Sequence, residues 1–317
     1  MHLRMLLLLF SLLLLAFLLY YSDFFKVVSL LAKANPFYVF FGFCVWFFGM
    51  IVRTERWRYI LSKARIKLPF WQTAKVYVAG MFLSNITPAK VGDPLRSVLL
   101  KAACKKSIGS SLPSVFVERI FDVIVTVLFS AIGLVFFFSS FSSWFLIAVG
   151  IYLIVFGSGV YILISRKRTE RFFVKFSSVF KFAKVEKKVE KFSRSLHKAF
   201  MMYKDKKTLL TTFVYSLLVW LVEGAILWVS FLSIGISINI AFSVTIVALT
   251  TMIAVLTFLP GGLGSSEAVT ILVFTTFFHL SAAEVMSAAI LSRLFGYWVY
   301  VLLGAVLLAS SKYKGKI

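Results

Sequence analysis

Acidic residues are scarce in this sequence: 12 of its 317 residues are Asp or Glu, against 35 Lys and Arg, which gives a formal net charge of +23. Charged residues make up 15% of the chain and hydrophobic residues 61%, and the mean hydropathy is +0.95. A water-soluble domain of this size cannot bury so much apolar surface, so the composition excludes a soluble globular protein. It predicts a membrane protein that crosses the bilayer several times.

Cysteine and histidine are almost absent as well. Cys44 and Cys104 lie 60 positions apart, a spacing that indicates neither a disulfide framework nor a metal site, and the 3 histidines are scattered. The chain has no paired acids at metal-ligand spacing, no Ser–His constellation and no ATP-binding glycine loop. We therefore expect no metal or other cofactor and no enzymatic activity.

Basic residues are abundant, but they lie almost entirely between apolar runs. Loops rich in Lys and Arg remain in the cytoplasm, so this distribution predicts a plasma-membrane protein with both termini cytoplasmic and without a nucleic-acid partner. The longest basic stretch, a cytoplasmic insert at 166–208, contains an amphipathic helical pattern. Such a helix fits the anionic inner leaflet, the protein's own cytoplasmic face or a partner enzyme, and these alternatives stay open.

Six uninterrupted apolar runs predict full membrane spans. The second run is followed by Arg53–Arg58, where basic residues outnumber acids. This stretch is interpreted as part of a cytoplasmic loop, with Arg56 and Trp57 anchored at the membrane interface. The predicted spans are Met5–Tyr21, Pro36–Val52, Ser114–Phe138, Trp144–Ser165, Leu209–Ser233 and Ala283–Ala309.

Two further apolar segments are interrupted near their middle, one by Ser84–Arg96 and the other by Leu259–Glu267, which reads Leu-Pro-Gly-Gly-Leu-Gly-Ser-Ser-Glu. Proline cannot continue a helix, and open backbone at membrane depth is tolerated only where protein buries it or water fills a cavity. Counting passes predicts two re-entrant broken-helix hairpins, the first entering from the cytoplasm and the second from outside. The expected fold class is an all-α polytopic membrane protein with eight hydrophobic segments.

The two interrupted segments carry matching polar residues. Asp93 follows the first break, and Glu267 follows the second break 174 positions later. Arg119 and Arg293 also differ by 174, so that each half places an arginine 26 residues after an acid. With the opposite entry sides, this pattern predicts an inverted-topology repeat, the arrangement that places a site at the membrane midplane. The repeats cover about 36–139 and about 209–310 of a single domain, 1–317.

Ionised residues at bilayer depth cost roughly 2.5–3.5 kcal/mol each, so they are functional candidates. We expect the two half-helix N-termini and the arginines to bind an anionic headgroup, while the acids balance charge or take a proton. Two alternatives stay open: the acids at the breaks only cap helices, and Glu118, Arg119 and Asp122 only pair among themselves. The candidate substrate-binding residues are Asp93, Arg119, Glu267, Arg293, Glu223, Asn85, Arg96, Gly262 and Gly264.

Several of these motifs together resemble one known family over essentially the whole chain. They are Arg56-Trp57, Asn85…Pro88…Gly92-Asp93…Arg96, Glu118-Arg119…Asp122, Leu259-Pro-Gly-Gly-Leu-Gly…Glu267 and Arg293. In them the chain resembles the lysylphosphatidylglycerol synthetase transmembrane family, a flippase-like membrane domain. The chain departs from the pattern at Asp93, where the family usually has Glu, and it carries no soluble aminoacyltransferase domain. The resemblance implies lipid translocation or handling of a lipid-linked group, without aminoacyl transfer.

The expected function is movement of a phospholipid or lipid-linked headgroup across the bilayer, with membrane lipids as partners. A secondary transporter for a small ion or polar solute suits inverted repeats and buried acids equally well. A scaffold that positions partner enzymes at the basic insert is a further alternative, and an enzyme acting on a lipid-linked sugar ranks last. Uptake of a solute without lipid movement would separate the second function from the first.

Overall fold

The computed structural model describes residues 2–87, 90, 92–104, 106–137, 203 and 205–310, together with isolated positions between 147 and 171. Every regular element within these ranges is helical. Pro88 and most of both the predicted span Trp144–Ser165 and the basic insert 166–208 lie outside the described residues.

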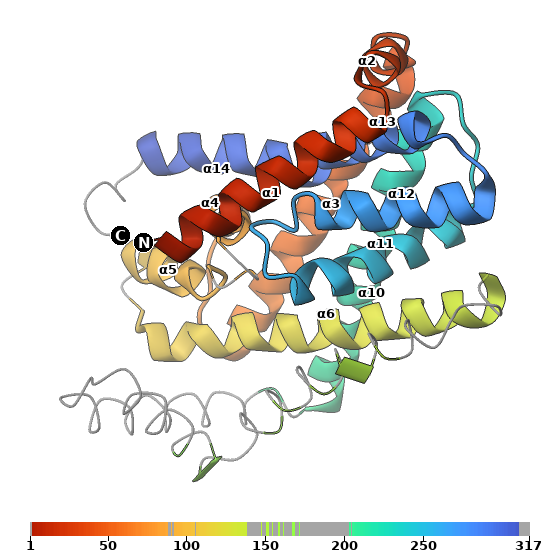
Figure 1. The fold of residues 1–317 in the computed structure, drawn as a ribbon. Coiled ribbons are helices and arrows are strands. Elements are labelled where there is room, and N and C mark those ends of the chain that lie inside the picture. The colour runs from red at the N-terminus through yellow and green to blue at the C-terminus, as the bar shows by residue number, and fades with distance from the viewer. Residues whose placement is uncertain are drawn as a thin grey trace.

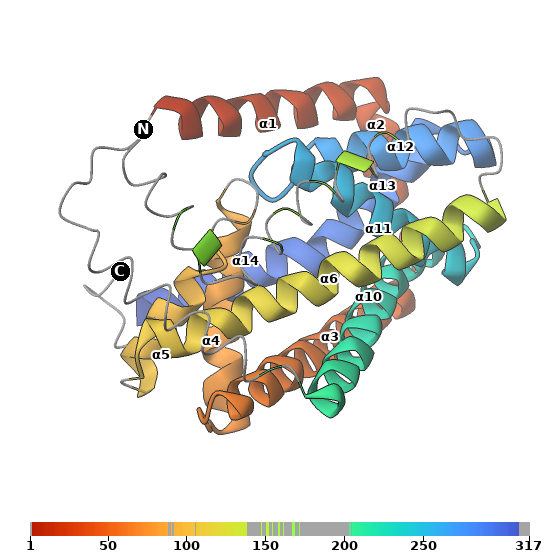
Figure 2. The same ribbon diagram turned by 90° about the horizontal axis from the view of Figure 1, so that it is seen from below.

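The chain begins with two helices, α1 (His2–Tyr21) and α2 (Phe24–Ala32), whose axes differ by 82°. The bend lies at Asp23, which has a left-handed φ of 60° and accepts a hydrogen bond from the amide of Lys26 as the N-cap of α2. The predicted first span is therefore helical, but a second, separate helix follows it. In Figures 1 and 2, α1 lies along the outside of the molecule.

Helices α3 (Pro36–Lys63) and α10 (Lys206–Ser233) pack against each other along their length. Each has 28 residues and a side-chain N-cap. At α10 this cap is Asp205, and the pKa of its carboxyl is lowered because the Thr208 amide donates a hydrogen bond to it. The two helices confirm predicted spans and form the central pair of the fold.

The second predicted span is shorter than the helix that the structure shows. We expected it to end at Val52, but α3 continues as a helix to Lys63 because nothing in the stretch breaks it and Ile60 and Leu61 extend its apolar face. Arg56 and Trp57 are 1% and 0% exposed, so the predicted interface anchors are buried inside the protein. The interpretation of this stretch as a loop is wrong, while its position on the cytoplasmic side stays a prediction.

Both predicted interruptions are present as pairs of short helices. The first pair is α4 (Phe70–Asn85) and α5 (Leu95–Cys104), and the second is α11 (Ile240–Leu256) and α12 (Ser265–Phe278). In both ribbon views α5 lies at the end of the molecule where α6 begins, and α12 runs out toward the opposite end (Figures 1 and 2). The two hairpins thus enter the bundle from opposite ends, whereas their orientation in a membrane stays a prediction.

The remaining long helices are α6 and a composite C-terminal helix. α6 (Ile108–Phe137) has 30 residues, and the C-terminal helix consists of α13 (Ala282–Arg293), a π-helical turn η1 (Leu294–Trp298) and α14 (Val299–Ser310). In the described ranges, three helices are long and apolar enough to cross a membrane, namely α3, α10 and the composite helix Ala282–Ser310. The number is four if α1 and α2 form one bent span. The protein is therefore an integral membrane protein with several passes, while the predicted number of six full spans stays a prediction.

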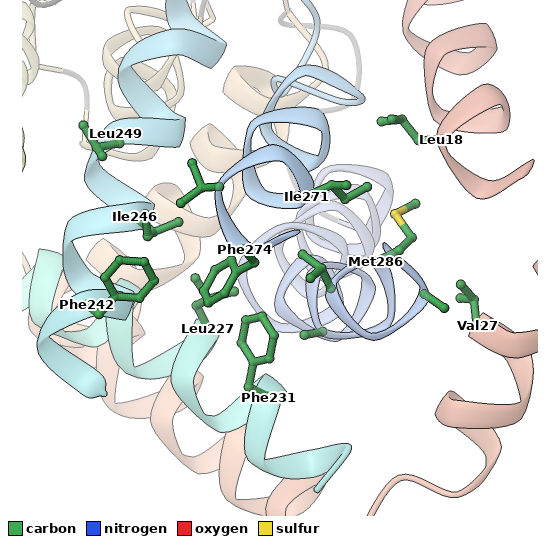
Figure 3. Close-up of a cluster of buried hydrophobic side chains, with 14 residues drawn as sticks. Leu18, Val27, Leu227, Phe231, Phe242, Ile246, Leu249, Ile271, Phe274 and Met286 are labelled. Carbon is green, nitrogen blue, oxygen red and sulfur yellow. The ribbon is translucent and has the colours of Figure 1, made fainter. Parts of the chain in front are cut away.

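The largest apolar cluster holds the second hairpin in place. Phe231 of α10, Phe242 of α11 and Phe274 of α12 meet at its centre, with ring centroids of Phe231 and Phe274 4.5 Å apart (Figure 3). Leu18 of α1 and Val27 of α2 cover the cluster from outside. Because these side chains come from five helices, the cluster positions the break between α11 and α12.

Gly304 allows α14 to approach α4 closely. A Cβ atom at this position would lie 2.4 Å from Cβ of Phe82 and 2.9 Å from the carbonyl oxygen of Val78. We expect Gly304→Val to lower the free energy of unfolding by about 1–3 kcal/mol, because overpacking forces the helices apart. SDS titration in mixed micelles measures this change. Val306→Leu is the control, since Val306 is 63% exposed, and a loss equal to that of Gly304→Val would refute the packing argument.

Candidate functional site

The two helix breaks meet at one cavity. The cavity has a volume of about 200 Å³ and is lined by Asn85 and Lys90 from the first break and by Gly261 and Gly262 from the second. The hydroxyl of Tyr297 donates a hydrogen bond to the carbonyl oxygen of Asn85 over 3.4 Å, which joins η1 to the end of α4. Segments more than 170 residues apart in the chain thus form one site.

Arg293 fastens the second break to α13. Its Nε lies 2.5 Å from Oε1 of Glu267, and its two terminal nitrogens donate to the carbonyl oxygens of Gly261 and Gly262 over 2.7 and 2.9 Å. It also donates to the hydroxyl of Ser266. Gly261 and Gly262 have φ values of +59° and +63°, a left-handed conformation that turns their carbonyl groups toward the guanidinium at little cost.

Glu267 has two functions in this arrangement. Its Oε2 accepts a hydrogen bond from the amide of Gly264 over 2.8 Å, which caps α12, while Oε1 pairs with Arg293. The alternative that the acids at the breaks only cap helices is therefore wrong for Glu267. Its carboxylate is 2% exposed, so its charge depends on the arginine for compensation.

The first break has a matching ion pair. Nε of Arg119, on α6, lies 3.1 Å from Oδ2 of Asp93, and its Nη2 lies 3.4 Å from Oδ2 of Asp122. The acid and the arginine that the sequence places 26 residues apart in each half therefore form an ion pair in both halves. Arg119 also pairs within its own helix, as the local alternative expected, but it does not pair there alone.

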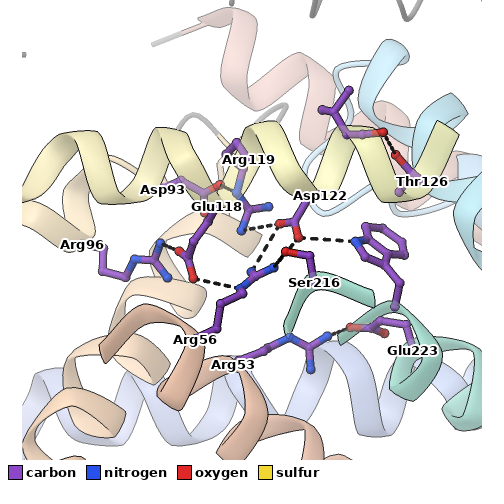
Figure 4. Close-up of polar contacts among 12 residues, drawn as sticks. Arg53, Arg56, Asp93, Arg96, Glu118, Arg119, Asp122, Thr126, Ser216 and Glu223 are labelled. Atoms are coloured by element: carbon purple, nitrogen blue, oxygen red, sulfur yellow. Dashed lines mark hydrogen bonds and ion pairs between the residues drawn. The ribbon is translucent and has the colours of Figure 1, made fainter. Parts of the chain in front are cut away.

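A larger ionic cluster lies beside this pair (Figure 4). Arg56 lies between Glu118, at 3.2 Å, and Asp122, at 2.5 Å, and it also donates to the hydroxyl of Ser216 over 3.0 Å. The second oxygen of Glu118 pairs with Arg96. Arg96 in turn stacks over the rings of Trp57 and Tyr77, with its guanidinium carbon 4.4 and 4.7 Å from their centroids.

A further ion pair joins the two halves directly. Arg53 of α3 pairs with Glu223 of α10 (Figure 4). This contact joins α3 to α10 beside the cavity, whose lining includes both side chains.

The structure brings most of the predicted site residues together. Six of the nine candidates line the cavity, while Asp93, Arg96 and Gly264 are not part of the lining. Arg96 serves the ionic cluster, and Gly264 ends the second break with a φ of +84°. A substrate-binding role for any of the nine stays a prediction. The candidates that line the cavity are Asn85, Arg119, Glu223, Gly262, Glu267 and Arg293.

Sequence reasoning missed several charged or polar residues of the lining, among them Arg53, Arg56 and Tyr297. The helical pattern continues without interruption beyond Val52, and this pattern could have predicted that both arginines lie inside the protein. No sequence signal places Tyr297, because its position depends on the π-helical turn. Lys90, a residue of the first break, also lines the cavity.

The chemistry available at the cavity is ionic. Among the residues that the structure describes, no group of three or more His, Cys, Asp or Glu side chains could hold a metal ion. The lining carries five cationic side chains, Arg53, Arg56, Lys90, Arg119 and Arg293, and three carboxylates, Asp122, Glu223 and Glu267. Apolar side chains such as Val219, Leu227 and Val247 complete the wall.

Comparison with known proteins places the chain among membrane proteins. It is 26% identical over 295 residues to a UPF0104 membrane protein of Methanothermobacter thermautotrophicus, with 88% of this chain and 87% of the relative covered. It is 24% identical over 319 residues to a UPF0104 membrane protein of Pyrococcus horikoshii, with 93% of each covered. Residues 4–304 match the family described as the lysylphosphatidylglycerol synthase TM region. The motifs at the two breaks and this match over nearly the whole length agree, and the chain therefore belongs to that family.

Proposed function

We propose that this protein translocates a phospholipid, or a lipid-linked headgroup, across the plasma membrane without catalysing a chemical reaction. The observation that carries the proposal is the cavity at which the two helix breaks meet. A site of this kind, built from broken helices that enter from opposite ends, is typical of proteins that give a substrate alternating access to the two sides of a membrane.

The lining of the cavity supports a lipid rather than a small solute. It combines a charged wall, which includes Arg119 and Arg293, with an apolar wall, which includes Val219, Leu227 and Val247. An amphipathic substrate offers a charged headgroup to the first wall and the start of its acyl chains to the second. The family is named for the synthase of lysylphosphatidylglycerol, itself a phospholipid, which agrees with this substrate class.

In the proposed mechanism the ion pairs hold each break open beside the cavity. Arg293 and Arg119 fasten the breaks to α13 and α6, and Arg53–Glu223 joins the halves. A headgroup enters the cavity from one side, lies beside these ion pairs, and leaves when the halves rock against each other. Both termini lie in the cytoplasm in this arrangement, and any driving force comes from a gradient.

The experiment is a plug that is added after folding. Thr251 lines the cavity and is partly exposed, so Thr251→Cys, in a chain with Cys44→Ser and Cys104→Ser, can be labelled with a bulky maleimide. The measurement is the rate at which fluorescent phospholipid moves between the two leaflets of reconstituted vesicles. We expect labelling to reduce this rate to that of protein-free vesicles. The same variant before labelling is the control, because it must keep its rate.

Two results would overturn the proposal. Lipid movement that persists after complete labelling would show that the cavity is not the path. Electrogenic or proton-coupled uptake of a solute, blocked by the label while no lipid moves in either preparation, would establish the secondary transporter instead. Neither result depends on the stability of the folded protein, since the label is added to protein that is already folded.

A further inference from the structure

The charges at the site are balanced except at one side chain. Each arginine of the cavity lining has a carboxylate partner: Arg53 has Glu223, Arg293 has Glu267, and Arg56 and Arg119 share Asp122. Glu118 and Asp93, just outside the lining, complete the compensation of Arg56 and Arg119, and Glu118 also compensates Arg96. The ionic network therefore has little capacity left for a ligand.

Lys90 is different from these arginines. It lines the cavity and is partly buried, and its ammonium group makes no ion pair or hydrogen bond to any residue in the part of the chain that the structure describes. Its electrostatic neighbours include two arginines, Arg119 and Arg53, as well as Asp93 and Asp122, which are already paired. An ammonium group without a partner at such a place is unfavourable unless a ligand completes it.

The backbone at Lys90 carries a second cost. Its φ is +57°, in the left-handed region where a residue with a Cβ is strained and glycine is not. A glycine at this position would remove both the backbone strain and the unpaired charge. The first break nevertheless has a lysine there. Strain of this kind concentrates at functional sites, where it serves to present a side chain.

We propose that Lys90 is the primary binding group for a substrate with one uncompensated negative charge, namely the phosphodiester of an anionic phospholipid, and that Arg119 and Arg293 hold the breaks in place rather than bind phosphate. This inference rests on the proposed function for its choice of a lipid. The ammonium group offers three donors to the phosphate oxygens. One surplus positive charge matches phosphatidylglycerol, whereas the trimethylammonium group of phosphatidylcholine adds a cation to a site whose lining already has five.

The test measures binding and not transport, so that it is independent of the proposed function. The purified full chain in dodecyl maltoside is titrated with dioctanoyl phosphatidylglycerol or dioctanoyl phosphatidylcholine by isothermal titration calorimetry. We expect Lys90→Met to weaken binding of the anionic lipid by at least about 10-fold, the loss of a charge-assisted hydrogen bond, and to leave phosphatidylcholine unchanged. Lys90→Arg retains the binding, and so does Lys75→Met, which changes an exposed lysine of α4.

Thermal unfolding separates binding from a structural role. Lys90→Met without lipid is expected to melt at the same temperature as the wild type or higher, because the variant loses an uncompensated cation, yet the stabilisation by phosphatidylglycerol is lost. A variant that melts at a lower temperature without lipid and keeps the stabilisation would overturn the inference and make Lys90 a structural residue. Unchanged affinity of Lys90→Met for phosphatidylglycerol would overturn it directly.

Soluble glycerophosphoglycerol tests whether the ligand is a phospholipid or a soluble phosphodiester without acyl chains. We expect it to compete weakly with the dioctanoyl lipid, because it lacks the acyl chains that meet the apolar wall. Equal affinity would refute a lipid as the ligand. If labelled lipid does not move in vesicles while Lys90-dependent binding of phosphatidylglycerol persists, the translocation function is wrong and the binding site is supported.

Discussion

Replacing Glu118 by alanine is expected to lower the free energy of unfolding by about 3–5 kcal/mol, the cost of removing one partner from a fully buried ion pair. Glu118 is 0% exposed and accepts from two arginines, Arg56 and Arg96, which are 1% and 2% exposed. Without the carboxylate, Arg96 has no acid partner among the described residues, and Arg56 has Asp122 alone. Titration with SDS in mixed micelles measures the loss.

A double variant tests whether the loss of stability comes from a buried arginine that has lost its carboxylate. Arg96→Met together with Glu118→Leu removes the arginine that would be left without a partner, and buried ion pairs replaced by apolar groups of similar volume often leave stability unchanged or increased. We therefore expect the double variant to recover most of the loss. Glu55→Ala is the matched control on α3: its pair with Arg58 is partly exposed, and such pairs contribute about 0–1 kcal/mol. A loss for Glu118→Ala no greater than that of the control would contradict the structure of the cluster.

Replacing Arg293 by alanine is expected to abolish lipid translocation and to lower the free energy of unfolding by about 3–5 kcal/mol. The substitution leaves Glu267 buried without its cation, removes the donor to the carbonyl oxygen of Gly261 and removes one of several donors to that of Gly262. A backbone acceptor that loses its donor inside the protein is costly, so the second break should lose its shape. Exposure of labelled lipid in vesicles and SDS titration measure the two effects.

Neutralising Glu267 tests which part of the effect is electrostatic. Arg293→Ala with Glu267→Gln removes the uncompensated charge, so part of the stability should return. Translocation should not return, because the carbonyl oxygen of Gly261 still lacks its donor and Arg293 no longer fastens the break to α13. Arg58→Ala, at an exposed pair on α3, should change neither quantity. Wild-type rates of lipid movement in the Arg293 and Glu267 double variant would refute the role of this ion pair.

The breaks themselves were predictable because the signal is local. Pro260 and the glycines that follow it cannot continue a helix, whatever packs around them, and the break lies at residues 257–264 between α11 and α12. The equal spacing of acid and arginine in the two halves was also visible, and both pairs proved to be ion pairs. Their function in holding the breaks was not visible, since spacing along the chain does not specify a partner.

The C-terminal end of α3 and the buried position of Arg56 were not predicted by counting charges. Rules for loops count basic residues, and by such a count Arg53–Arg58 belongs outside the membrane. The rule fails here because Glu118 and Asp122, more than 60 positions away, compensate Arg56 inside the protein. A charge rule that considers one segment at a time cannot include a partner on another helix.

By itself, the amino-acid sequence determined that the chain is a helical membrane protein with two broken segments, because hydropathy, proline and glycine act on the residues beside them. Tertiary structure alone decided which charges meet. Arg53 finds Glu223, and Asn85 finds Tyr297, across 170 and 212 positions, and Lys90 is left without a partner among the described residues. The physical reason is that the packing of helix faces sets these distances, and an ionised side chain at such depth is tolerated only where that packing supplies its counter-charge.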